Sequence, residues 1–111
     1  MFQGSLETDM KVYFSHGKES GPWGTKIKRL AKIAEGMGCA VESVDYTDLM
    51  DPVLRVERLL EVLASEEGRF LLVGSSMGGY VSLVASETVK QLEAALEEFR
   101  SVEEVLAVTN G

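Results

Sequence analysis

The stretch that decides the fold of this chain reads Arg69-Phe-Leu-Leu-Val-Gly-Ser-Ser-Met-Gly-Gly-Tyr-Val-Ser-Leu-Val-Ala85. A short apolar run ends at Gly74, and a second apolar segment with helical spacing follows Gly78 at once. This order predicts a strand, a sharp turn and a helix. The turn has the spacing G-x-S-x-G around Ser76. Glycine suits both flanking positions, because a strand that reverses so tightly into a helix leaves no room for side chains beside the serine.

Strands and helices also alternate in the preceding part of the chain. β-Branched and aromatic residues predict strands over residues 10–15 and 39–44, and helical spacing predicts helices over 25–37 and from Pro52 to about 64. Each helix is expected to turn a stripe of apolar residues toward the sheet. On the first helix the stripe consists of Ile27, Leu30, Ala31, Ile33, Ala34 and Met37. On the second it consists of Val53, Val56, Leu59, Leu60 and Leu63, and the charged residues expected to face outward are Arg55, Glu57, Arg58 and Glu61. Such alternation indicates a parallel sheet covered on both faces. Right-handed crossovers place the first strand between the second and the third.

The last part of the chain is less clear. Residues 88–100 continue with helical spacing, and the pattern leaves open whether they form one helix with the segment after Gly78. Residues 101–109 fit either a capping box at Ser101 and Glu104 or a fourth strand. We expect the strand, because it would cover the open edge of the third one. The fold class that follows is a three-layer α/β sandwich with a short parallel sheet of order 2-1-3-4.

Composition narrows the possible functions. The chain has 111 residues, 45% of them hydrophobic, and a net charge of −7. Nucleic acids and anionic membranes need basic patches, so we expect neither as a partner. No apolar run reaches the roughly 18 residues of a membrane span, and we expect a cytoplasmic protein. With one histidine and one cysteine, Cys39, we expect no metal site and no disulfide within the chain.

The chain has no linkers or repeats that would divide it. Residues 1–9 show no periodicity and are interpreted as a flexible leader or a leftover of an expression vector. Residues 10–111 are expected to form a single α/β domain of a size that buries a real core.

Residues 10 to about 90 resemble the α/β-hydrolase superfamily, specifically its small esterase-like members. The resemblance rests on a strand ending in His16-Gly17, the loop Gly21-Pro22-Trp23-Gly24, a strand ending at Asp45, and the turn Gly74-Ser75-Ser76-Met77-Gly78-Gly79. It implies the amino-terminal half of that fold, with the turn as a nucleophile elbow and Ser76 at the nucleophile position. It also implies an oxyanion hole built from the N–H of Met77 and the N–H of Gly17 or Lys18.

The sequence departs from the family after the elbow. Members place the acid and the histidine of the triad after the serine, but this chain has no Asp and no His after Ser76. His16 could serve as a base only if it reached Ser76; the alternative is a structural histidine. Asp45, Asp48 and Asp51 are imaginable as a triad acid or a Mg²⁺ cluster, and their spacing fits turn and helix-cap chemistry better. We therefore expect a truncated or recombined chain.

Two main hypotheses for the function follow. The first is a serine-hydrolase-like domain with little or no activity that binds a small ester or an anion at Ser76, because the amino terminus of a helix attracts anions. The alternative is a non-catalytic folding or association module that forms a homodimer through an uncovered edge or face of the sheet. In a third hypothesis a partner chain supplies the missing His and Asp. None of these hypotheses involves a cofactor, and whether the chain is an enzyme stays open.

Overall fold

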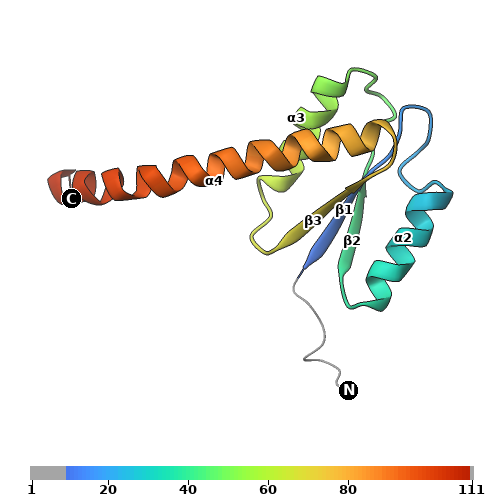
Figure 1. The fold of residues 1–111 in the computed structure, drawn as a ribbon, viewed down its shortest axis with the longest axis horizontal. Coiled ribbons are helices and arrows are strands. Elements are labelled where there is room, and N and C mark those ends of the chain that lie inside the picture. Colours follow the sequence, from blue (N-terminus) through green and yellow to red (C-terminus); the bar gives the residue numbers. More distant parts are fainter. Residues whose placement is uncertain (1–9, 111) are drawn as a thin grey trace.

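The computed structural model describes residues 10–110 of the chain. Its strands are β1 (Lys11–Ser15), β2 (Ala40–Val44) and β3 (Phe70–Gly74). All pairs are parallel and the order is β2-β1-β3. The helices α2 (Thr25–Gly36), α3 (Pro52–Leu63) and α4 (Met77–Asn110) each follow one strand, as Figure 1 shows. The predicted order of the first three strands is confirmed, whereas the interpretation of residues 1–9 lies outside the described residues.

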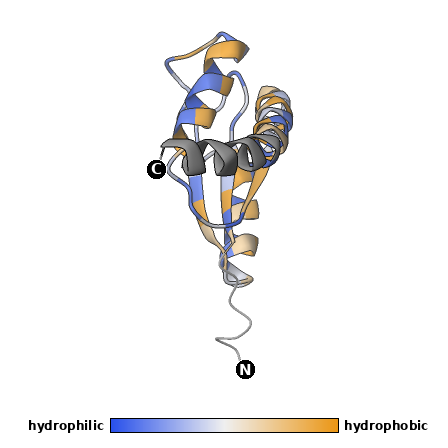
Figure 2. Ribbon diagram, turned by 90° about the vertical axis from the view of Figure 1, so that its left-hand side faces the viewer, coloured by the Kyte–Doolittle hydropathy of each residue, from blue (hydrophilic) through white to orange (hydrophobic). Residues whose placement is uncertain are grey.

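The sheet separates two small apolar cores. Alternate side chains of a strand point to opposite faces, so Val12 and Phe14 pack with Ile27 and Ala31 of α2, while Tyr13 faces the other way. On that second face the core consists of Tyr13, Val44, Tyr46, Val56, Leu59, Leu63, Val81 and Ala85. The sheet thus lies between α2 and the pair α3 and α4, which confirms the three layers. Bands of apolar and hydrophilic residues alternate along the helices in Figure 2.

The inward face of α3 differs from the predicted stripe. Asp51 begins the helix by accepting a hydrogen bond from the Val53 N–H at 2.8 Å, with Pro52 in the first turn. Arg55, predicted to face solvent, is fully buried, and Val53, predicted to face inward, is 56% exposed. Arg55 lies four residues before Leu59, hence on the same side of the helix as the core.

The predicted stripe of α2 is only partly buried. Ile27 and Ala31 are covered by the sheet, but Leu30, Ile33 and Met37 are exposed. A sheet of three strands is too narrow to cover the full width of an apolar helix face. The part of that face beyond β1 and β2 therefore stays open to solvent.

The predicted fourth strand is wrong. Residues 101–109 belong to α4, which runs without interruption from Met77 to Asn110 and extends past the end of the sheet (Figure 1). No proline stands anywhere after Met77, and no glycine between Gly79 and Asn110, so nothing in the sequence forces the helix to stop. The residues that could form a strand continue a helix that is already nucleated. Between residues 10 and 110 no helix is long and apolar enough to cross a membrane.

Candidate functional site

The turn between β3 and α4 has the shape expected of a nucleophile elbow. Ser76 has a φ of 53°, the only positive φ of a non-glycine residue in the described part of the chain, and its side chain is exposed. Such a left-handed conformation is strained for an L-residue and is common at functional turns. The N–H groups of Gly78 and Gly79 donate to the carbonyls of Ser75 and Ser76 at 2.8 Å. These bonds close the first turn of α4 behind the serine.

Two glycines make this turn possible. A Cβ on Gly74 would lie 2.0 Å from the carbonyl oxygen of Gly78, and a Cβ on Gly78 would lie 1.8 Å from that of Ser15. Neither distance can be tolerated, so the strand and the helix approach closely only because both positions lack side chains. The N–H of Ser75 donates to the Ser15 carbonyl at 3.1 Å, which attaches the elbow to the end of β1.

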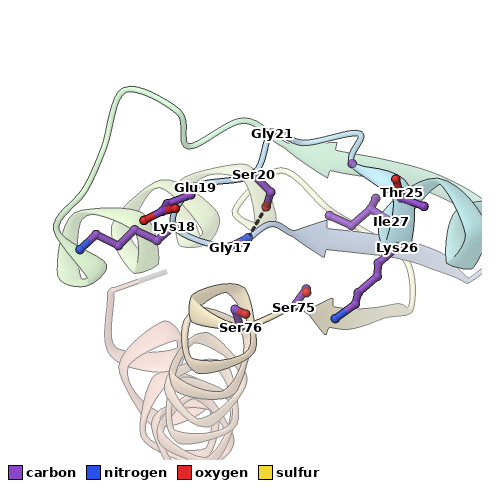
Figure 3. Close-up of a pocket in the computed structure, with 11 residues that line it drawn as sticks. Gly17, Lys18, Glu19, Ser20, Gly21, Thr25, Lys26, Ile27, Ser75 and Ser76 are labelled. Carbon is purple, nitrogen blue, oxygen red and sulfur yellow. Dashed lines mark hydrogen bonds between the residues drawn. The ribbon is translucent and has the colours of Figure 1, made fainter.

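The loop after β1 lies beside the elbow. A Cβ on Gly17 would come within 3.2 Å of the Cβ of Ser76, so the two backbones are in close contact. Residues 17–21 and 24–27 and the two serines of the elbow line a groove of about 560 Å³, whose side chains Figure 3 shows. This groove lies where the carboxyl ends of β1 and β3 meet, the edge at which parallel sheets bind ligands.

The backbone N–H groups of Lys18 and Met77, the two candidate oxyanion donors, have no hydrogen-bond partner among residues 10–110. Met77 is the first residue of α4, where helical N–H groups have no partner within the helix. The N–H of Gly17, by contrast, donates to the Ser20 Oγ at 3.0 Å. Of the two donors expected in the loop, Lys18 is thus the one that is free.

His16 does not face Ser76. Its ring is fully buried, with Nε2 accepting from the Tyr46 N–H at 2.8 Å and Nδ1 lying 2.8 Å from the Gly17 carbonyl. An N–H can only donate and a carbonyl can only accept, which assigns the neutral ring with its proton on Nδ1. Asp45 lies 3.9 Å from Nε2, but a neutral ring forms no ion pair with it.

A buried group of polar side chains packs against the loop that begins at His16. The hydroxyls of Ser15 and Tyr46 are 2.8 Å apart and fully buried. Burial raises the pKa of Tyr46, although its bond to Ser15 acts in the opposite direction. Arg55 lies over the Tyr46 ring, with its guanidinium carbon 5.4 Å from the centroid. This group joins β1, β2 and α3 directly under His16 and Gly17.

The three aspartates after β2 have structural partners. Asp45 accepts from the backbone and the hydroxyl of Thr47, and these bonds hold the pKa of Asp45 below its usual value. Asp48 pairs with Arg58 at 2.6 Å, which lowers the pKa of Asp48. Asp51 caps α3. No group of three potential metal ligands occurs among the described residues. The predicted turn and cap chemistry accounts for Asp45 and Asp51, whereas Asp48 forms an ion pair with Arg58.

Arg55, Tyr46 and Ser20 are the site residues that the sequence prediction missed. The spacing of Arg55 from Leu59 and Leu63 carried a signal, since all three repeat every four residues on one helix face. Tyr46 and Ser20 belong to loops, where no periodicity indicates burial.

Comparisons with known proteins agree with this geometry. Residues 10–101 match the model of the "Uncharacterised protein family (UPF0227)". A solved structure from Xanthomonas campestris pv. campestris, assigned to the α/β superfamily of hydrolases, is similar with a TM-score of 0.62 and 37% sequence identity. The match covers 68% of this chain and 49% of that one, so the chain spans about half the length of that protein. No curated protein matches significantly.

Proposed function

Because the chain belongs to the UPF0227 family and resembles the α/β hydrolases in fold and elbow, we propose that it is a serine-hydrolase-like domain with an oxyanion site but no activated nucleophile. Ser76 takes the nucleophile position, and the N–H groups of Met77 and Lys18 are the oxyanion donors. A small ester or anion would bind between them. Turnover is little or none.

The observation that carries this proposal is that the backbone occupies both ring nitrogens of His16. A serine hydroxyl attacks an ester near neutral pH only when a positioned base removes its proton. His16 is the only histidine of the chain, and both of its ring nitrogens are engaged by the backbone. To act on Ser76 the ring would have to leave a buried site and abandon two hydrogen bonds, each of which is costly to leave unmade.

The donors support the binding part of the proposal. Lys18 lines the groove and Met77 directly follows Ser76, so their free N–H groups lie on either side of the serine, where they can stabilise an oxyanion. The amino terminus of α4 adds the favourable end of its dipole. The groove is open to solvent at Ser76, which is exposed. A tetrahedral anion such as phosphate can therefore reach the same donors that an ester intermediate would use.

Turnover of p-nitrophenyl acetate tests this function. The chain is expected to hydrolyse the ester no faster than its Ser76→Ala variant and the uncatalysed background. A rate that exceeds both, and that falls to background with Ser76→Ala, would contradict the proposal. Titration with inorganic phosphate, followed by amide NMR, tests binding separately: the Met77 and Lys18 resonances are expected to move together.

A second candidate function is association into a homodimer. β3 is an edge strand; its Leu71 is 49% exposed, and Leu83 of α4 is 63% exposed. Both line a groove of about 380 Å³ between β3 and α4. An open strand edge beside exposed apolar side chains favours pairing with another chain. Light scattering should give a dimer that Leu83→Glu dissociates, whereas a monomer at high concentration would speak against this function.

A further inference from the structure

The buried guanidinium of Arg55 has no carboxylate among its hydrogen-bond partners in the part of the chain that the structure describes. Arg55 is fully buried against Tyr46 of the second core, and within residues 10–110 its hydrogen bonds go only to backbone carbonyls. One nitrogen, Nη2, has no partner there at all. Burying a charge without a counter-charge is costly, so stability alone does not explain this arginine.

Two of the three hydrogen bonds of Arg55 go to His16 and Gly17, next to Ser76. Nη1 donates to the carbonyls of His16 at 3.2 Å and Gly17 at 3.1 Å, and Nε donates to that of Leu49 at 2.6 Å. The Gly17 carbonyl also receives the Nδ1–H of His16. Two buried donors therefore fix the direction of one carbonyl.

The fixed carbonyl determines where the next N–H points. The Gly17 carbonyl and the Lys18 N–H belong to one peptide plane, and no peptide bond in the described residues is cis. In a trans peptide the C=O and the N–H point in opposite directions. Because Arg55 and His16 hold the Gly17 carbonyl on the buried side, the Lys18 N–H points away from the core, and Lys18 lines the groove beside Ser76.

We propose that Arg55 is a positioning residue for the oxyanion site, because its guanidinium holds the Gly17–Lys18 peptide in the orientation that presents the Lys18 N–H to the groove. This inference rests on the proposed role of that N–H in anion binding. Arg55 touches no ligand itself. Without it, the peptide is held by His16 alone and samples other orientations.

Residual dipolar couplings of the backbone amides test the orientation without any ligand. In the weakly aligned, unchanged chain, the Lys18 N–H coupling should agree with the alignment fitted to the amides of β1, β2 and β3. In Arg55→Met it should depart from that fit, while the Met77 coupling still agrees. Arg58→Met is the matched control, since Arg58 lies on the same helix and bonds to Asp48 at the surface.

The inference is overturned if the Lys18 coupling disagrees with the fit in the unchanged chain, or if it stays the same in a folded Arg55→Met. Should that variant not fold, Arg55→Gln decides, because its shorter amide cannot replace the guanidinium at the three carbonyls; an unchanged Lys18 coupling there overturns the inference as well. If phosphate did not bind to the unchanged chain, the proposed function would be contradicted. The dipolar couplings would still test whether Arg55 orients the Gly17–Lys18 peptide.

Discussion

Gly78 lies so close to the end of β1 that a Cβ on it would stand 1.8 Å from the carbonyl oxygen of Ser15. This contact joins the first turn of α4 to β1, the strand that precedes the proposed oxyanion loop. It fixes how near Ser76 comes to Gly17, and it belongs to backbone atoms that cannot move aside independently of the sheet.

The variant Gly78→Ala should therefore lose about 3 kcal/mol or more of unfolding free energy, at or beyond the usual range for overpacking. Urea unfolding measures the loss. Gly36→Ala is the control, because a Cβ at Gly36 meets nothing within 4 Å; at this last position of α2 the substitution should leave the stability unchanged or raise it by up to about 1 kcal/mol. A Gly78→Ala protein as stable as that control would contradict the close contact.

The left-handed conformation of Ser76 predicts an unusual effect of glycine. Ser76 has a φ of 53°, which costs an L-residue about 1–2 kcal/mol. Glycine relieves this strain but loses about 0.5–1 kcal/mol in chain entropy. Ser76→Gly should thus be more stable than Ser76→Ala by roughly 0.5–1 kcal/mol. Finding Ser76→Gly the less stable of the two would show that the serine is not strained.

The cap of α3 can be tested in the same way. Asp51 accepts from the Val53 N–H at 2.8 Å, and its removal in Asp51→Ala should lower the unfolding free energy by about 1 kcal/mol. Glu57→Ala, at an exposed position of the same helix, should change it by less than about 0.5 kcal/mol. If both substitutions changed the unfolding free energy by the same amount, the Asp51 side chain would not cap α3.

The pair Tyr13 and Glu66 predicts how stability depends on pH. The Tyr13 hydroxyl donates to the Glu66 carboxylate, and this bond lowers the pKa of Glu66 below its usual 4.5. Burial, followed by the same bond, raises the pKa of Tyr13 above its usual 10.0. Because the pKa of Glu66 is lowered on folding, the ionised carboxylate stabilises the fold above pH 4.5, and this stabilisation is lost as the pH falls. Because the pKa of Tyr13 is raised on folding, the protonated hydroxyl stabilises the fold below pH 10.0, and this stabilisation is lost as the pH rises.

Tyr13→Phe should flatten both sides of this profile, as measured by urea midpoints below pH 4.5, at neutral pH and above pH 10.0. Tyr80→Phe provides the control, since Tyr80 is 51% exposed and should leave the profile unchanged. If Tyr13→Phe kept the slopes of the unchanged chain on both sides, the pair would not govern the pH dependence.

Much of the fold could be predicted from the sequence because local patterns decide it. Alternating strands and helices gave the parallel sheet and its order, and the spacing of Gly74, Ser76 and Gly78 gave the elbow. These features depend on backbone geometry and on periodicity, which a single sequence displays directly.

The remaining features depend on distant contacts. Whether residues 101–109 pair with β3 or continue α4 is decided by competition between an open sheet edge and a helix already formed, and the helix prevails. Arg55 looked like a surface residue because arginine is rarely buried. Its burial follows from carbonyls that the folded loop directs toward α3, which only the structure brings together.

The central claim is that Ser76 is presented but not activated, and labelling with a fluorophosphonate probe tests it most directly. Intact-mass spectrometry of the chain after incubation should show no adduct over a period in which an active serine hydrolase, run alongside, is fully labelled. Rapid, stoichiometric labelling that disappears in Ser76→Ala would contradict the claim, since it would mean that a base within this chain activates the serine.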